Sequence, residues 1–368
     1  MKCRKIVVDE AIPFLKGILE PYSEVIYLPG EEISRPVLKN ADALLVRTRT
    51  LCNESLLAGT AVQFIGTATI GTDHLDLDYL ERAGIQWVSA PGCNAGSVCQ
   101  YILSALFEIA SRSGKPLNTL TLGIAGAGHI GNRVAQAARA LEMNILLCDP
   151  PRARSEGAPG FHSFETLVRN SDILTFHVPL TKSGEDSTFH LADQSFFKNV
   201  RPGMWLINSS RGAVVNNSLL AGSLASGKIA GAVLDVWEGE PEIPEKLLSL
   251  VSIATPHIAG YSLDGKANAT TQMIQKWAAF FEVTELASYR VKLPPSGTDL
   301  PPDFYQLPLP RAIETLYRKS YDILKDDAFL RAAPENFEKL RKNYRSELRR
   351  EPDTAILSRL GFTNFEKK

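Results

Sequence analysis

The chain has 368 residues, enough for two or three domains with large cores. Its 40 basic and 41 acidic residues leave a formal net charge of -1, so no overall electrostatic field favours binding to nucleic acid or to an anionic membrane. We expect neither a signal peptide nor a membrane span, because the N-terminus reaches Asp9 after three apolar residues and no stretch approaches roughly 20 apolar residues. Five cysteines without a CxxC pair favour a reducing cytoplasm over disulfides or structural zinc.

The first part of the chain alternates short β-rich runs with helical patterns, which is typical of a parallel sheet. The runs lie at 5–9, 43–47, 63–66 and 86–89. A long helical pattern follows at 95–113, with apolar residues at helical spacing, and it is long enough to cross between two lobes. We therefore expect a hinge helix there.

A second βαβ series contains six β-rich runs, the number in a doubly wound nucleotide-binding fold. These runs lie at 121–125, 145–148, 173–176, 205–208, 232–234 and 252–255. The helical pattern at 265–283 could return to the first lobe and make that lobe discontinuous. Six prolines in 290–310 predict an extended linker, and beyond it lie helical patterns at 311–330 and 335–350 and a small apolar run at 356–362.

A glycine motif stands where the second series begins, and it reads Gly126-Ala127-Gly128-His129-Ile130-Gly131. The motif alone is weak evidence, but here an apolar strand precedes it and a helical pattern follows it. Gly126 permits a tight turn, Gly128 lets the backbone approach a pyrophosphate, and Gly131 allows the helix to pack on the sheet. The helix N-terminus would supply amide donors to a bound dinucleotide.

Asp149 ends the next strand, 18 residues after Gly131. An acidic residue near this offset accepts hydrogen bonds from the adenosine ribose and repels a 2′-phosphate, so the sequence favours NAD over NADP. The alternative is that Asp149 only begins the turn at Pro150.

Three polar residues follow predicted strand ends, where parallel sheets bind ligands: Arg211, Asp235 and His257. Oxidation of a 2-hydroxy acid requires hydride transfer to a nicotinamide and removal of the hydroxyl proton. We predict His257 as the base, Glu240 as the carboxylate that orients it, and Arg211 as the cation for the substrate carboxylate or developing carbonyl.

The remaining histidines need separate treatment. His74, His162 and His190 lie in predicted loops or helix starts, where a surface histidine is the ordinary interpretation. His177 also follows a strand, and position alone does not exclude it as a base. No HExxH motif or carboxylate cluster indicates a catalytic metal.

Together these motifs resemble the D-isomer-specific 2-hydroxyacid dehydrogenases, which use an Arg, a Glu and a His in the same chain order. The resemblance covers about residues 1 to 290. Several segments resemble, more specifically, the members that oxidise 4-phospho-D-erythronate in pyridoxal 5′-phosphate biosynthesis. These segments are 66–74, 90–95, 148–152, 235–241, 255–265 and, beyond residue 290, 340–344.

The resemblance implies roles for further residues. Thr48 and Thr69 would contact the substrate, Tyr261 would lie at its end, and Asp149, Asp235 and Gly260 would contact NAD. Thr48 replaces an expected serine and keeps its hydroxyl. Val178 replaces an expected threonine, so that any cofactor contact there would come from the backbone. Because no diffuse field exists to attract a phosphate, we expect Arg47 and Tyr261 to contribute to phosphate binding.

The resemblance also implies the domain organisation. We expect an α/β protein with two Rossmann-like parallel-sheet lobes and a small C-terminal α+β dimerisation domain. The expected boundaries are 1–94 and 259–289 for the substrate-binding lobe, 95–258 for the NAD-binding domain, and 290–368 for the dimerisation domain.

An apolar stripe at helical spacing marks the last segment and is formed by Phe337, Leu340, Tyr344 and Leu348. We expect it to face a second copy in a homodimer, although the chain's own lobes could also cover it. The neighbouring basic residues are interrupted by glutamates, so solvated charges are favoured over nucleic-acid binding; they are Lys339, Arg341, Lys342, Arg345, Arg349 and Arg350.

The sequence therefore predicts a cytoplasmic, NAD-dependent oxidation of 4-phospho-D-erythronate. One alternative is another enzyme of the class, such as a 3-phosphoglycerate dehydrogenase or a hydroxypyruvate reductase. The other is a non-catalytic, NAD-sensing interaction protein with the same fold, against which the intact Arg211, Glu240 and His257 argue.

Overall fold

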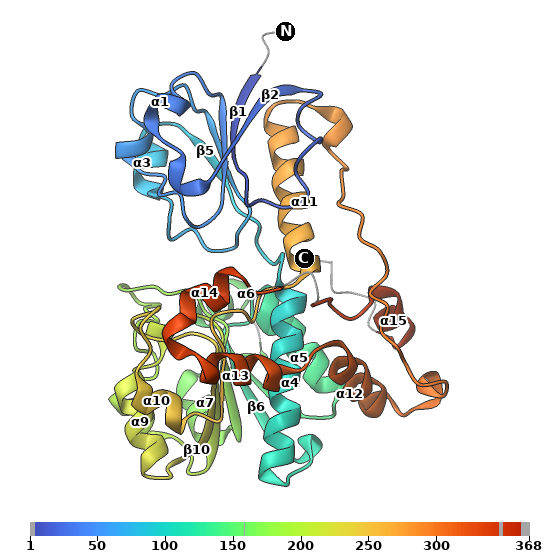
Figure 1. Cartoon of the computed structure of the whole chain (residues 1–368). Helices are drawn as coiled ribbons and strands as arrows, with labels where there is room; N and C mark the ends of the chain where they lie inside the picture. The colour runs from blue at the N-terminus through green and yellow to red at the C-terminus, as the bar shows by residue number, and fades with distance from the viewer. Residues whose placement is uncertain (1–3, 158, 346–348, 362–368) are drawn as a thin grey trace. The chain divides into compact units, whose positions relative to one another are not determined.

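The chain folds into two compact units in a computed structural model that describes residues 4–157, 159–345 and 349–361. The first unit holds residues 1–94 and 263–294, and the second holds 95–262 and 295–368. Each unit contains one parallel sheet with helices on both faces (Figure 1). The expected pair of α/β lobes, with the first lobe discontinuous, is therefore confirmed.

The first unit is built on a five-stranded parallel sheet in the order β2-β1-β3-β4-β5. Its strands are β1 (Arg4–Asp9), β2 (Ser23–Leu28), β3 (Ala43–Val46), β4 (Phe64–Thr67) and β5 (Gln86–Val88). The sequence did not predict β2, which pairs with β1 along its whole length. As an edge strand it is only half-buried and carries Ser23 and Glu24 at its start, so it lacks the continuous apolar pattern of a central strand.

Helices cover both faces of this first sheet. On one face, α11 (Leu263–Phe280) buries Met273, Ile274 and Trp277 against the strands. The other face packs against short helices whose buried residues include Leu38, Leu57 and Leu80. The short elements are η1 (Gly30–Glu32), α1 (Arg35–Leu38), α2 (Glu54–Leu57), α3 (Leu77–Arg82) and, after α11, η4 (Thr284–Leu286).

The second unit has a six-stranded parallel sheet in the order β11-β10-β9-β8-β6-β7. All six strands match predicted runs: β6 (Thr121–Ala125), β7 (Asn144–Cys148), β8 (Ile173–Phe176), β9 (Met204–Asn208), β10 (Ile229–Leu234) and β11 (Ile253–Ala254). The strand order reverses between β6 and β8, and ligands bind outside the carboxyl ends of strands at such a switch point.

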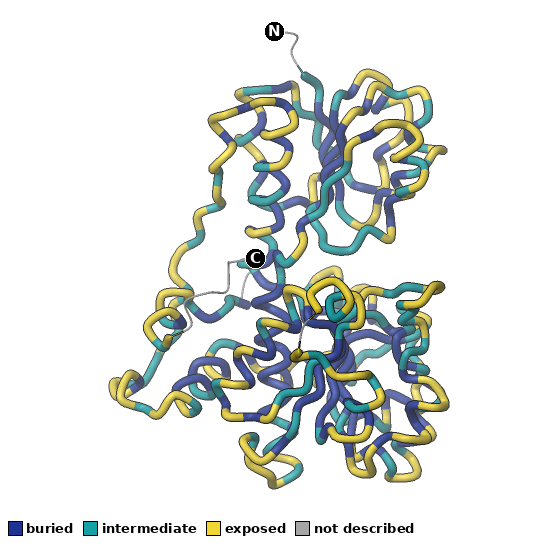
Figure 2. The backbone as a smooth tube through the Cα atoms, turned by 180° about the vertical axis from the view of Figure 1, so that it is seen from behind, coloured by how far each residue is buried: buried dark blue, intermediate teal, exposed yellow. Residues whose placement is uncertain are grey.

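Two groups of helices enclose this second sheet. One face carries α4 (Ala95–Ser113) and α5 (His129–Ala140), and α4 is buried over most of its length (Figure 2). The expected hinge helix is thus a core helix of the second unit. The other face and the connections hold η2 (Leu117–Thr119), α6 (Pro150–Glu156), α7 (Phe164–Asn170), α8 (Gln194–Asn199), η3 (Gly212–Val214), α9 (Asn217–Ala225) and α10 (Glu245–Leu250).

The segment after residue 295 joins the second unit. We expected a mixed α+β fold there; its described residues form helices and no strand. They are η5 (Phe304–Gln306), α12 (Leu309–Ser320), α13 (Ile323–Ala332), η6 (Pro334–Asn336), α14 (Phe337–Lys342) and α15 (Thr354–Arg359). The expected helix at 311–330 is broken at Tyr321, and the Asp322 side chain caps α13 by accepting from the Leu324 amide. The expected helix at 335–350 ends at Lys342, and Phe362 lies outside the described residues.

The apolar stripe packs within the chain. Phe337 is 1% exposed in the core of the second unit, together with Leu330, and Leu340 packs against the same cluster. The Tyr344 hydroxyl donates to the buried Asp326 carboxylate at 2.9 Å. The expectation that this stripe faces a second copy is therefore wrong for these residues, and Leu348 lies outside the described part.

The proline-rich segment forms no helix or strand at 290–301, as expected of an extended linker, but it does not hold the C-terminal helices away from the second unit. Phe304 within it is 1% exposed and belongs to the same core as α4 and α12. It therefore ties the C-terminal helices to the second unit.

Candidate active site

The glycine loop between β6 and α5 has the shape that a pyrophosphate requires. Gly128 is the N-cap of α5, and no atom lies within 4 Å of the position that a Cβ would take there. A Cβ at Gly131 would instead collide with the Gly126 carbonyl oxygen, so only glycine lets the helix approach the loop. His129 and Ile130 form the first turn of α5, whose free amides and dipole favour an anion.

Asp149 lies beside this loop, at the end of β7. One of its carboxylate oxygens accepts from the Ala127 amide at 2.8 Å, and the other caps α6 by accepting from the Arg152 amide at 3.1 Å. Asp149 therefore begins a turn, as one interpretation of the sequence expects, and also adjoins the glycine loop, where the other interpretation places an acceptor for the ribose. The Arg152 guanidinium, which could attract a 2′-phosphate, is paired with Glu156 at 2.7 Å.

His177 is not suited to act as the base. Its Nε2 atom lies 3.1 Å from the Thr175 hydroxyl, and its Nδ1 atom is buried without a hydrogen-bond partner among the described residues. Burial lowers the pKa of this imidazole to about 3, so it does not accept a proton near neutral pH. Val178 follows it, beside Gly126, and its side chain offers no polar contact.

A histidine–carboxylate dyad lies at the carboxyl ends of β10 and β11. The His257 Nδ1 atom is 2.8 Å from the Glu240 Oε2 atom, and the second Glu240 oxygen accepts from the Trp237 amide at 2.8 Å. Burial alone would raise the pKa of Glu240, but the hydrogen bond and charge attraction from His257 hold it below its usual value. An ionised Glu240 therefore fixes the tautomer of His257 and leaves Nε2 as its proton-accepting nitrogen.

The backbone around the dyad is held in a strained conformation. His257 has a φ of +58°, in the left-handed region that residues other than glycine seldom adopt. Its amide donates to the Asp235 carbonyl at 2.7 Å. The Asp235 carboxylate, 1% exposed, accepts from the Ile258 and Ala259 amides at 2.8 Å each and from the Thr255 hydroxyl at 2.6 Å.

The C-terminal segment binds the carbonyl groups of the same two residues, Ile258 and Ala259. Arg349, 3% exposed, donates to the carbonyls of Ile258 at 2.9 Å and Ala259 at 3.1 Å. It also donates to the Ser97 carbonyl at 2.6 Å and to Gln100 Oε1 at 2.9 Å. The expectation of solvated charges in this region is wrong for Arg349, whose burial depends on partners up to 252 residues away.

Arg211 joins the dyad at a pocket of about 290 Å³. It ends the short loop after β9, and a Cβ at the next residue, Gly212, would collide with the Trp237 carbonyl, so the two loops touch directly. The pocket is lined by Leu180, Arg211, Gly212, Ala213, Trp237, Glu238, Gly239, Glu240 and His257. The structure thus brings together the three predicted catalytic residues around one cavity.

Tyr261 and the C-terminal segment meet beside this pocket. Gly260 and Tyr261 follow the clamped peptides, and the Tyr261 amide donates to the Ile258 carbonyl at 2.8 Å. The Tyr261 side chain is hydrogen-bonded to Arg341 of α14 and makes an edge contact with the Tyr344 ring. Arg341 also lies 4.0 Å from Glu240 Oε2. Sequence reasoning missed this residue, because a single basic residue in a charged helix gives no sign of what it faces.

The predicted substrate residues of the first unit gather at one edge of its sheet. Arg47 and Thr48 follow β3, and Thr69 follows the adjacent strand β4. The Arg47 guanidinium donates to the Ala11 carbonyl at 3.3 Å, and Thr48 is exposed. The Thr69 hydroxyl lies 2.7 Å from that of Thr67, which is 3.0 Å from His74 Nε2.

Two other histidines differ from the expectation of surface residues. His74 is 6% exposed, and burial lowers the pKa of its imidazole. His190 forms a second histidine–carboxylate pair with Glu238, at 2.6 Å between Nε2 and Oε1. Because Glu238 also binds the Asn217 amide at 2.7 Å, this pair anchors the loop that carries Glu240.

Among the described residues, no group of three or more His, Cys, Asp or Glu could hold a metal ion.

Comparison with known proteins identifies the family. The chain is 44% identical over 348 residues to erythronate-4-phosphate dehydrogenase of Bacteroides fragilis, covering 94% of this chain and 97% of that protein. It is 45% identical to the enzyme of the same name from Escherichia coli O157:H7, covering 92% of this chain and 90% of that one. This chain belongs to the erythronate-4-phosphate dehydrogenase family.

Two family models match parts of this family member. Residues 105–259 match the NAD-binding domain of D-isomer specific 2-hydroxyacid dehydrogenases, a range that includes the glycine loop, Arg211, Glu240 and His257. Residues 306–364 match a domain of unknown function. The resemblance to the 2-hydroxyacid dehydrogenases is thereby confirmed, and NAD is the cofactor of the matched domain.

Solved structures show the same fold. The chain resembles a D-lactate dehydrogenase from Aquifex aeolicus, solved with NAD and lactic acid, with a TM-score of 0.62 and 26% identity over 79% of this chain and all of that one. A formate dehydrogenase from Staphylococcus aureus, solved with NAD, has a TM-score of 0.60 and 24% identity over 76% of this chain and 96% of that one.

No described helix is both long and apolar enough to cross a membrane.

Proposed function

We propose that this chain oxidises 4-phospho-D-erythronate to (R)-3-hydroxy-2-oxo-4-phosphooxybutanoate with NAD, as a step in pyridoxal 5′-phosphate biosynthesis. The observation that carries the proposal is the His257–Glu240 pair at 2.8 Å, which shares a pocket with Arg211. The 44–45% identity to erythronate-4-phosphate dehydrogenases over almost the whole chain supports this substrate among those of the class.

The chemistry follows from the charges in the pocket. His257 Nε2 accepts the proton of the C2 hydroxyl, and Glu240 stabilises the imidazolium that forms. Arg211 binds the substrate carboxylate and polarises the oxygen that becomes the carbonyl. A bound NAD would supply the hydride acceptor, so that C2 would lose a hydrogen with two electrons while the hydroxyl proton passes to His257.

The glycine loop fits the cofactor. The open space beside Gly128, the amides that begin α5 and the carboxylate of Asp149 provide a phosphate cradle and a ribose acceptor. We propose that Val178, Asp235 and Gly260 complete the cofactor site. Since the Asp235 carboxylate is fully engaged with the 255–259 backbone and Thr255, its contribution is to hold Gly260 in place.

We further propose that Arg47, Thr48, Thr69 and Tyr261 bind the substrate, with Arg47 and Tyr261 directed to its phosphate. The exposure of Thr48 and the partly exposed guanidinium of Arg47 support this role. The His74–Thr67–Thr69 hydrogen-bond chain orients the Thr69 hydroxyl.

The direct test is NADH formation, followed by absorbance, with 4-phosphoerythronate, 3-phosphoglycerate and glycerate supplied separately. We expect the highest kcat/KM with 4-phosphoerythronate. A preference for 3-phosphoglycerate or glycerate would assign the chain to another activity of the class. NAD binding without turnover of any 2-hydroxy acid would support a sensing protein.

We also propose a cytoplasmic homodimer, with the 290–368 segment as its dimerisation domain. The four described cysteines are buried and form no disulfide, as in a reducing compartment. Phe329 on α13 is 64% exposed and Leu324 is 38% exposed, which leaves apolar surface for a second copy. Truncation near Arg290 would also remove Arg349, so the cleaner test is sedimentation of Phe329→Asp, for which we expect a monomer. A wild-type monomer at micromolar concentration would refute the dimer.

A further inference from the structure

Arg341 places a positive charge beside the catalytic dyad. Its Nη1 atom lies 4.0 Å from Glu240 Oε2, the same oxygen that binds His257 Nδ1 at 2.8 Å. The Arg341 side chain is 25% exposed and its hydrogen bond to Tyr261 fixes its position. This cation comes from α14, a helix in the segment that matches a domain of unknown function.

We propose that Arg341 is a positioning residue that tunes the proton affinity of the His257–Glu240 dyad. Protonation of His257 adds a positive charge to a pair that already adjoins a cation. Because the Glu240 oxygen that Arg341 approaches is the one that binds His257, the positive charge of Arg341 opposes a second positive charge on the imidazole and favours the neutral ring that can accept the substrate proton. It also keeps Glu240 ionised, which preserves the tautomer that the reaction needs.

Other charged and titratable groups also face the pair, and Arg211 lines the same pocket as a second cation. Glu238 is engaged with His190, and Asp235 is buried under the backbone of 258 and 259. Glu338, 3.9 Å from Arg341, partly offsets its charge but is 52% exposed and therefore well screened. The groups that face the dyad from all packed elements are Asp235, Glu238, Arg211, Tyr261, Glu338 and Arg341.

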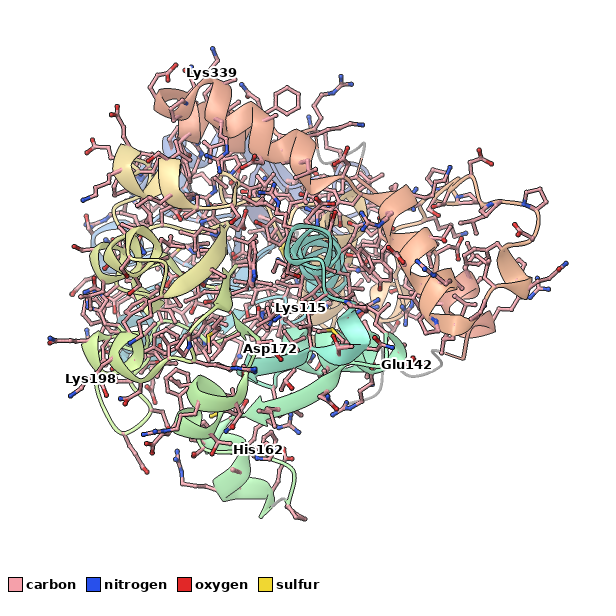
Figure 3. The ribbon with its side chains drawn as sticks, turned by 90° about the horizontal axis from the view of Figure 1, so that it is seen from below. Lys115, Glu142, His162, Asp172, Lys198 and Lys339 are labelled. Carbon is pink, nitrogen blue, oxygen red and sulfur yellow. The ribbon has the colours of Figure 1, made fainter. Side chains whose placement is uncertain are left out.

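The test compares three variants of the full-length protein. Arg341→Gln removes the charge, Arg341→Lys keeps it, and Lys339→Gln removes one charge from the outer face of the same helix. Lys339 is exposed and points to solvent (Figure 3). The first readout is kcat/KM for oxidation across pH, and the second is NMR titration of the His257 ring in the cofactor-free protein.

Without Arg341 the dyad holds its proton more tightly, so the acidic limb of the profile moves to higher pH. We expect a shift of about 0.5–1 pH unit in Arg341→Gln, because the group is partly exposed. At pH values below the limb, that shift corresponds to a loss of about 3- to 10-fold in kcat/KM. At high pH, kcat/KM should reach a plateau within twofold of the wild-type value. Arg341→Lys and Lys339→Gln should keep the wild-type limb, and the His257 titration midpoint should move with the limb.

A pH-independent loss in Arg341→Gln, or an equal shift in Lys339→Gln, would overturn the proposal. If Arg341→Gln does not fold, Glu338→Gln provides the test, because it removes an anion beside Arg341. The acidic limb of its pH profile should move by a smaller amount in the opposite direction. A limb that does not move would contradict the proposal. The kinetic readout rests on the proposed function, but the NMR readout does not. A protein that oxidises no 2-hydroxy acid would refute that function while the titration still tests Arg341.

Discussion

Replacement of Arg349 by methionine should destabilise the second unit and impair turnover. The guanidinium donates to Gln100 Oε1 and to the carbonyls of Ser97, Ile258 and Ala259. It is also hydrogen-bonded to the Tyr344 side chain and stacks on the Tyr321 ring at 3.9 Å, at a position 3% exposed. Methionine would fill part of the space but would leave these buried acceptors without their donor.

The size of the effect follows from these contacts. Hydrogen bonds to a charged group contribute about 1.5–3 kcal/mol each, but they are not additive, and removal of the ion also relieves its own desolvation cost. Loss of one partner from a buried ionic network costs about 3–5 kcal/mol. For a unit of roughly 240 residues this corresponds to a fall in Tm of about 6–20 °C.

The assay is calorimetry of the full chain together with kcat/KM at 25 °C. Arg349→Lys should lose less stability, because lysine keeps the charge but not the planar set of donors. The control is Arg311→Met, which removes an arginine whose side chain is 74% exposed and paired with Glu314, a contact of about 0–1 kcal/mol. An Arg349→Met protein within 1 kcal/mol of wild type would refute the reasoning that the guanidinium holds the 258–259 peptides.

Further substitutions test the site itself. His257→Ala should lower kcat/KM by about 10²- to 10⁴-fold in a folded protein, and near-wild-type turnover would remove this residue from the mechanism. Asp149→Ser should weaken NAD binding and relax discrimination against NADP, measured by cofactor titration; an unchanged preference would make Asp149 only the cap of α6. Arg47→Ala should penalise 4-phosphoerythronate far more than unphosphorylated erythronate in kcat/KM, and equal losses would place Arg47 away from the phosphate.

The parts of the fold that sequence predicted are those with local signals. The central strands are short apolar runs between turns, and α4 repeats apolar residues at helical spacing, so both were predictable. The end of α12 at Ser320 was not, because neither proline nor glycine interrupts the pattern at 311–330 and the break depends on the packing of Tyr321.

The residues of the candidate site also divide into those with a local sequence signal and those without one. Arg211, Glu240 and His257 follow strand ends, where sheet topology brings distant residues together. Arg341 and Arg349 belong to no such pattern, and in sequence they look like solvated charges. Their roles depend on contacts across about 90 residues or more, which one sequence does not reveal.

The left-handed backbone of His257 sets local stability against activity. A histidine with a φ of +58° carries a conformational cost of about 1–3 kcal/mol, which glycine does not incur. Substitution by glycine would therefore relax the backbone while removing the proposed base. Engineering for heat resistance guided by stability alone would select that inactive protein, so a screen on this scaffold must score turnover alongside melting temperature.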